Sequence, residues 1–161
     1  MTAGIGTASA ASSNALLAIF WGGLACGVFD ISQAFLAWGI QNGVKPVMIL
    51  HHVASGLIGP ARANQGGTAT AALGLLLHFV IAFGAATVYY VASRWIPFMT
   101  KHAVISGLLF GEAVFLFMNF VVVPLSRAPR GRFSMATLIT CPIGHTVLVG
   151  LPIALSVRRF S

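Results

Sequence analysis

Long apolar runs that are almost free of acidic residues constrain the fold of this chain more than any other feature. One of them covers residues 102–126, and Glu112 lies near its middle. Asp30, the other of the two acidic residues in the chain, lies inside an earlier apolar run. An ionisable side chain at membrane depth is costly, so it usually faces the protein interior and has a partner. The partners of these two carboxyl groups are therefore the first thing to identify.

The composition places the chain in a lipid bilayer. Its 161 residues are 58% hydrophobic and 7% charged, whereas a soluble domain has roughly 25% charged residues. A spanning helix needs about 20 mainly apolar residues. Four runs qualify, at about 14–40, 68–93, 102–124 and 136–157. We therefore predict an all-α integral membrane protein with four transmembrane helices in a bundle, a single domain over 14–161. Residues 1–13 are small and polar, which predicts a mobile N-terminal tail.

A short helix is predicted between the first two spans, over about 46–58. Pro46 suits a first helical turn, and Gly59-Pro60 ends the segment. It is too short to span, so it lies at the interface or re-enters the membrane. His51 and His52 fall away from its apolar side. Adjacent helical residues point about 100° apart and converge poorly on one metal, so we expect both rings to face solvent or headgroups.

Small residues and tryptophans predict how the spans pack and where they end. Small-xxx-small pairs let helices approach closely, and two Gly-xxx-Gly pairs lie within the predicted spans: Gly23 with Gly27, and Gly107 with Gly111. Trp38 and Trp95 lie near the ends of apolar runs, where interfacial aromatic belts occur.

Four polar residues are predicted to share one layer near the bilayer centre. Asp30 lies about ten residues before the end of its run, and His78 about ten after the start of the next. At 1.5 Å per residue, both lie roughly 15 Å from one membrane face. Glu112 and His145 give a similar depth, which predicts pairs of Asp30 with His78 and of Glu112 with His145. Asn119 lies two turns after Glu112 on the same side. The layer either serves a function or only holds the helices in register.

The basic residues favour lipid over nucleic acid as a partner. A net charge of +7 is compatible with nucleic-acid binding. However, the nine Lys and Arg residues lie between or beyond the apolar runs, where such residues set topology and contact lipid headgroups. Five lie on one side of the predicted bundle and four on the other, so this balance does not fix the orientation. The missing basic start of a secretory signal favours cytoplasmic termini.

Four segments together resemble a known group of proteins: VASGLIG (53–59), LGLLLHFVIAFGAATVYY (73–90), MNFVVVPLS (118–126) and GLPIAL (150–155). The chain resembles an uncharacterised family of small bacterial four-helix inner-membrane proteins. The resemblance implies a multi-pass protein of the bacterial inner membrane, and it implies no activity.

Three hypotheses for the function follow from these residues. The first is a structural or accessory protein that forms a homo-oligomer or a subunit of a larger membrane complex. The second is a small proton-coupled transporter or permease that uses Asp30 and Glu112, because buried carboxyl groups and histidines exchange protons near neutral pH. The third is a haem bundle with His78 and His145 as axial ligands. The chain has no nucleophile motif, no phosphate loop and no Glu-x-x-His pair, so neither an enzyme nor a metal site is predicted.

Overall fold

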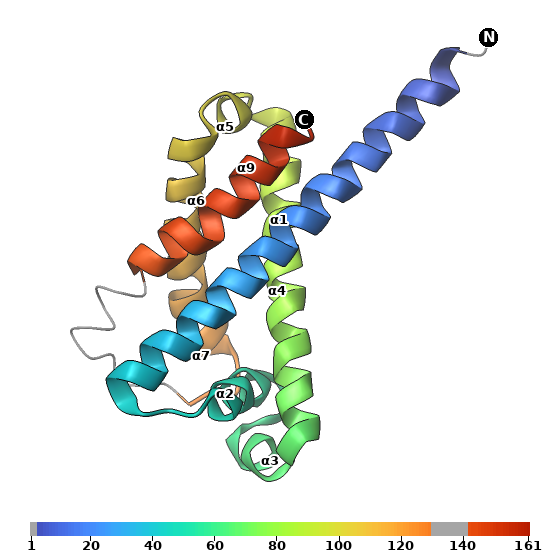
Figure 1. Cartoon of the computed structure of the whole chain (residues 1–161). Coiled ribbons are helices and arrows are strands. Elements are labelled where there is room, and N and C mark those ends of the chain that lie inside the picture. The colour runs from blue at the N-terminus through green and yellow to red at the C-terminus, as the bar shows by residue number, and fades with distance from the viewer. Residues whose placement is uncertain (1–2, 130–141) are drawn as a thin grey trace.

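The computed structural model describes residues 3–129 and 142–161, and the described residues are almost entirely helical (Figure 1). The elements are α1 (Ala3–Asn42), α2 (Pro46–Ile58), α3 (Pro60–Gln65), α4 (Gly67–Trp95), α5 (Phe98–Lys101), α6 (Ala103–Phe117), the π-helix η1 (Met118–Val122), α7 (Val123–Leu125), the π-helix η2 (His145–Gly150) and α9 (Leu151–Arg159).

Three of these helical stretches are long and apolar enough to cross a membrane. They cover Ser13–Asn42, Gly67–Trp95 and Ala103–Leu125. The all-helical prediction is therefore confirmed for the described residues, and three of the four predicted spans coincide with helices that could cross a membrane. The fourth predicted span, 136–157, begins among residues that lie outside the described part. Its described portion is helical from residue 142 and continues through η2 and α9.

Helix α1 begins at Ala3 rather than near residue 14, so most of the predicted tail is helical. Alanine, the best helix former, recurs between residues 3 and 11, and the first proline of the chain is Pro46. Nothing in this stretch therefore ends the helix.

The long helices lie across one another and connect two different ends of the molecule (Figure 1). Helix α1 packs on α4, η2 and α9, and α6 packs on η2 and α9. Short α5 and the carboxyl end of α9 lie at one end. The α2–α3 pair lies at the other end, beside the start of α4.

The end at α5 is closed by tight packing. Tyr89, Ile153 and Val157 are its largest fully buried side chains. The Tyr89 hydroxyl lies 3.0 Å from the Met99 carbonyl oxygen and 2.7 Å from the Ser106 hydroxyl, so it joins α4 to α5 and α6. Nearby, the Arg94 guanidinium donates to the Ser161 hydroxyl at 2.8 Å, and this contact holds the carboxyl end of the chain.

The predicted glycine pairs lie at close helix contacts, in two different ways. A Cβ at Gly111 would lie 2.8 Å from Thr146 Cα, so backbone meets backbone where α6 crosses η2. One at Gly107 would lie 2.8 Å from the Ala154 Cβ. Gly23 and Gly27 instead accept aromatic rings from α4, those of Phe83 and Phe79. Close approach of another helix was predicted at all four glycines; a neighbouring backbone comes close at Gly107 and Gly111, whereas phenylalanine rings take the space at Gly23 and Gly27.

Helix α2 matches its predicted bounds, and it lies against α4 through backbone contact. A Cβ at Gly74 would lie 2.7 Å from the Leu50 carbonyl carbon, and the carbonyl oxygen is closer still. His51 is buried, and its Nε2 lies 2.9 Å from the Gly67 carbonyl oxygen. The predicted solvent- or headgroup-facing position is therefore wrong for His51. The short turn at Gly59, with φ at +83°, folds α3 back toward α4 and brings Gly67 within reach of this ring.

Candidate functional site

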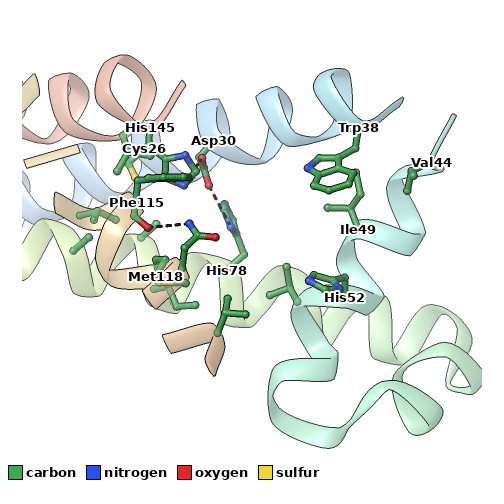
Figure 2. Close-up of a pocket in the computed structure, with 18 of the residues that line it drawn as sticks. Cys26, Asp30, Trp38, Val44, Ile49, His52, His78, Phe115, Met118 and His145 are labelled. Atoms are coloured by element: carbon green, nitrogen blue, oxygen red, sulfur yellow. Dashed lines mark hydrogen bonds and ion pairs between the residues drawn. The ribbon is translucent and has the colours of Figure 1, made fainter. Parts of the chain in front are cut away.

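A cavity of about 560 Å³ lies between the spanning helices and α2 (Figure 2). This volume is within the roughly 300–1,000 Å³ of small-molecule sites. Its described lining is mainly apolar, and polar side chains gather toward one part of it. The lining includes Cys26, Asp30, Trp38, His52, His78, Phe115, Met118, Asn119 and His145.

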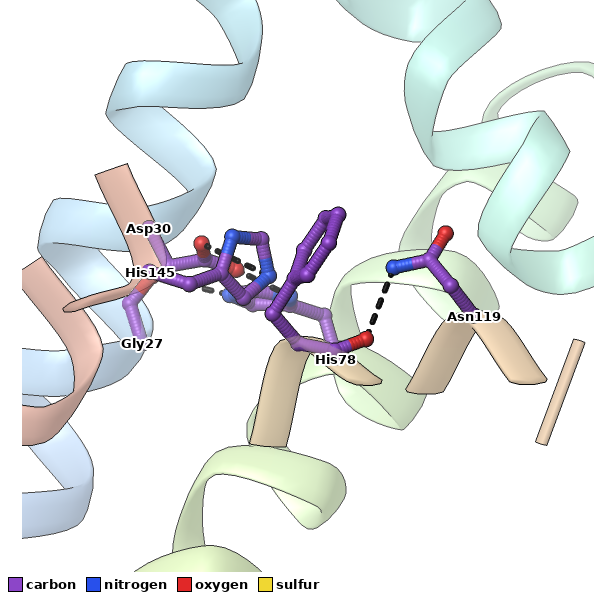
Figure 3. A network of polar contacts seen from close by, with 6 residues as sticks. Gly27, Asp30, His78, Asn119 and His145 are labelled. Atoms are coloured by element: carbon purple, nitrogen blue, oxygen red, sulfur yellow. Dashed lines mark hydrogen bonds and ion pairs between the residues drawn. The ribbon is translucent and has the colours of Figure 1, made fainter. Parts of the chain in front are cut away.

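Asp30 is the centre of the polar part of the cavity (Figure 3). Its Oδ2 lies 3.9 Å from Nδ1 of His78 on α4, and its Oδ1 lies 3.7 Å from Nε2 of His145 on η2. All three side chains are partly buried, and they come from three different helices. The predicted pair of Asp30 with His78 is found. We call Asp30, His78 and His145 the Asp–His cluster.

A hydrogen bond to the backbone fixes how His78 holds its protons. Nε2 of His78 lies 2.9 Å from the Gly27 carbonyl oxygen. A carbonyl oxygen only accepts hydrogen bonds, so Nε2 carries a hydrogen and Nδ1 faces Asp30. If Nδ1 were bare and the carboxylate ionised, two lone pairs would face each other. A proton on either group would remove this repulsion, so the contact of 3.9 Å is favourable when Asp30 or Nδ1 of His78 carries a proton.

Glu112 has a different partner from the one predicted. Its Oε2 accepts a hydrogen bond from the Thr146 hydroxyl at 3.1 Å. The predicted pairing of Glu112 with His145 is therefore wrong, because the His145 ring lies against Asp30 and against the Phe115 ring, whose centroid is 5.3 Å away. Glu112 also lies outside the described lining of the cavity. It joins α6 to η2 beside the Asp–His cluster.

Asn119 borders the cavity from the π-helix η1. Its amide nitrogen donates to the Phe115 carbonyl oxygen at 2.9 Å, as Figures 2 and 3 show. His145 opens the second π-helix, η2. Proline follows each π-helix, at Pro124 and Pro152, and a proline nitrogen cannot donate to the preceding turn. Such wide turns occur often at functional sites, and here both carry polar residues of the cavity.

The predicted interfacial residues divide between the cavity and the surface. Trp38 and His52 line the cavity near α2, a role the sequence did not predict (Figure 2). Part of the His52 ring is exposed, yet desolvation lowers its pKa below the usual value. Trp95 is 83% exposed at the end of α4, where an interfacial residue would lie. Its contact with a membrane interface stays a prediction.

The histidines do not fit the predicted haem site. An axial ligand needs a free ring nitrogen on the iron. Nε2 of His78 donates to Gly27 and Nδ1 faces Asp30, while His145 points at the same carboxylate. The two rings therefore both face the Asp30 carboxylate, and neither is placed as an axial ligand by these contacts. Within the described residues, no group of three or more histidine, cysteine or acidic side chains has the arrangement of a metal site.

Comparison with protein-family models, with curated proteins and with solved structures gives no match to this chain. The resemblance to small bacterial inner-membrane proteins therefore stays a prediction. The cavity and the Asp–His cluster are therefore the features that bear on the function.

Proposed function

We propose that this protein is a small proton-linked carrier that binds a mainly apolar molecule in the cavity. The observation that carries the proposal is Asp30, a carboxyl group on the wall of an apolar cavity and between two histidines. A purely structural ion pair needs no adjoining space. This one borders a cavity of ligand size, so a bound molecule would contact the same groups that hold the proton.

The proton has a defined place in this proposal. In the empty site we place it on Asp30 or on Nδ1 of His78, while the Gly27 carbonyl keeps the other ring nitrogen occupied. His145 provides a second imidazole at the opposite carboxylate oxygen. A ligand that interacts with Asp30 changes which of these groups keeps the proton. Binding and proton transfer are therefore linked, and such a link is what a coupled carrier requires.

The proposal includes the architecture that such a carrier needs. We place a fourth span over residues 136–157, both termini on the cytoplasmic side, and the protein in a bacterial inner membrane. Four helices form a narrow bundle, so we expect a homo-oligomer to complete the pathway through the bilayer.

A structural or accessory role is the second candidate, and one observation favours it. Asp30 contacts side chains on α4 and η2, so the Asp–His cluster also ties three helices together. Interhelical polar contacts in membranes contribute only about 0.6 kcal/mol on average, but they specify which helices associate. In that case the cluster would matter for assembly within a larger complex and not for proton movement.

Proton flux in liposomes separates the two candidates. Purified protein is reconstituted into vesicles that contain the pH dye pyranine, and an inward proton gradient is imposed. One permanently charged cation, one neutral molecule and one anion are then added in turn: methyltriphenylphosphonium, benzyl alcohol and benzenesulfonate. The proposal expects at least one of them to change the proton flux beyond that of protein-free vesicles, and Asp30→Asn to abolish this change.

Glu112→Gln is the matched control, because it neutralises the other acidic residue. A glutamine there still accepts the hydrogen bond from Thr146, so flux should persist. If no solute changes the flux of wild-type protein, or if both variants behave alike, the carrier proposal fails. Loss of a co-purifying protein in Asp30→Asn without any effect on flux would support the accessory role.

A further inference from the structure

The charges around the cavity identify a class of ligand. Within the described residues, Asp30 is the sole acidic residue of the lining, and neither lysine nor arginine lines the cavity. When the proton has left the Asp30–His78 pair and the histidines are neutral, the described lining carries one negative charge among mainly apolar groups. An anion would place a second negative charge beside it at low dielectric, whereas a cation would neutralise it.

We propose that the cavity binds a lipophilic organic monocation, which takes the place of the proton held by the Asp30–His78 pair. This inference rests on the proposed function and names its substrate class. The exchange balances in charge: one cation enters next to the Asp30 carboxylate, and one proton leaves the pair to water. Before and after, the site carries the same net charge, so neither state leaves an unpaired ion in the membrane interior.

The rest of the lining fits the apolar body of such a cation. The Phe115 and Trp38 rings line the cavity, and an aromatic face attracts a nearby cation. Met118 adds a flexible, polarisable side chain that adapts to ligands of different shape. These residues offer mainly apolar contact area, with the Trp38 indole N–H as a hydrogen-bond donor, and none of them is charged, so the selectivity rests mainly on the charge of Asp30.

The proton exchange gives cation binding a defined pH dependence. The other titratable groups that face Asp30 or line the cavity are His78, His145, His52 and Cys26. Protonation of either histidine beside Asp30 opposes a cation, so affinity rises with pH. One exchanged proton changes the affinity by up to tenfold per pH unit, in the range where the empty pair keeps its proton.

The test measures binding of methyltriphenylphosphonium to the detergent-solubilised full chain by calorimetry, with triphenylphosphine oxide as a neutral analogue that carries the same three rings. We expect the cation to bind more tightly than the oxide, with release of one proton into a weakly buffered solution. Asp30→Asn should lower the affinity on the order of 100-fold, because it removes the opposite charge from an apolar wall. Glu112→Gln should bind the cation as the wild type does.

A second variant covers the case that Asp30→Asn does not fold. His78→Gln keeps the carboxylate but removes its proton partner, so cation binding should persist with a weaker pH dependence and less proton release. Binding of the oxide as tightly as the cation, or cation binding without proton release, overturns the inference. If the liposome assay shows Asp30-dependent flux with benzyl alcohol or benzenesulfonate only, the ligand class is wrong while the carrier proposal survives. If neither phosphorus compound binds and no solute changes the proton flux, both the ligand class and the carrier proposal are wrong.

Discussion

The contact between α2 and α4 leads to a sharp prediction about the glycine at its centre. Gly74→Ala adds a methyl group 2.7 Å from the Leu50 carbonyl carbon, where ordinary contact begins near 3.4 Å. Because the Leu50 carbonyl oxygen lies closer still, helix α2 must retreat by more than the difference of about 0.7 Å that the carbon alone requires. Forcing an extra methyl group into a packed contact typically costs about 1–3 kcal/mol. Alanine is favoured over glycine within a helix by about 0.5–1 kcal/mol, which offsets part of this cost.

Gly84 on the same helix is the matched control. It is exposed, and a Cβ there meets nothing within 4 Å. Gly84→Ala therefore gains the stability that alanine gives a helix, without a clash against a neighbouring residue. The difference in unfolding free energy between the two alanine variants isolates the packing cost, about 1–3 kcal/mol. For a chain of this size it corresponds to several degrees in the midpoint of thermal unfolding.

The assay is thermal unfolding in a mild detergent, followed by far-ultraviolet circular dichroism. We expect Gly84→Ala to unfold at or above the wild-type temperature and Gly74→Ala clearly below it. Equal midpoints for the two variants would refute the reasoning, because they would mean that α2 is not held by backbone contact with α4.

Three further predictions use the same unfolding assay. His51→Ala removes the contact with the Gly67 carbonyl and should lower the free energy of unfolding by about 1 kcal/mol. His51→Gln retains a hydrogen-bond donor and should lose less stability. Equal losses of stability in the two variants would contradict the hydrogen bond. Desolvation lowers the pKa of His52, so the contribution of the neutral ring to the free energy of unfolding is complete above about pH 6.5 and is lost as the pH falls through the lowered pKa. The unfolding midpoint of the wild type should therefore drop on acidification, and His52→Gln should flatten this drop. Tyr89→Phe removes the hydroxyl between Met99 and Ser106 and should cost about 1 kcal/mol, and an unchanged midpoint would show that this hydroxyl contributes nothing.

The short helix and the spans were readable in the sequence because their signals are local. Pro46 and Gly59-Pro60 fix both ends of α2, and the apolar run of α4 ends within two residues of its predicted bounds. The pair of Asp30 with His78 was also predictable, because depth follows from counting residues along a helix. Residue types and spacing were enough for these features.

The partner of Glu112 was not predictable, because it depends on the rotation of a helix about its axis. His145 and Thr146 are adjacent, and the π-helical turn that begins at His145 is wider than an α-turn. A helical projection with a constant period therefore assigns the wrong face to one of them. The backbone contact at Gly74 and the buried position of His51 were not predicted, for a related reason. The contact of α2 with α4 is set by tertiary packing, and no spacing within either helix reveals it.

The two ends of the molecule should differ in how readily they open. Tyr89, Ile153 and Val157 are fully buried at one end, and Arg94 secures the carboxyl end. At the opposite end, α2 covers a cavity and is held by the Gly74 contact and the His51 hydrogen bond. Regions with fewer buried contacts open at lower free energy. Amide hydrogens of α2 and the first turns of α4 should therefore exchange with solvent deuterium sooner than those near Tyr89. If they do, a ligand would enter the cavity from the membrane face at which α2 lies.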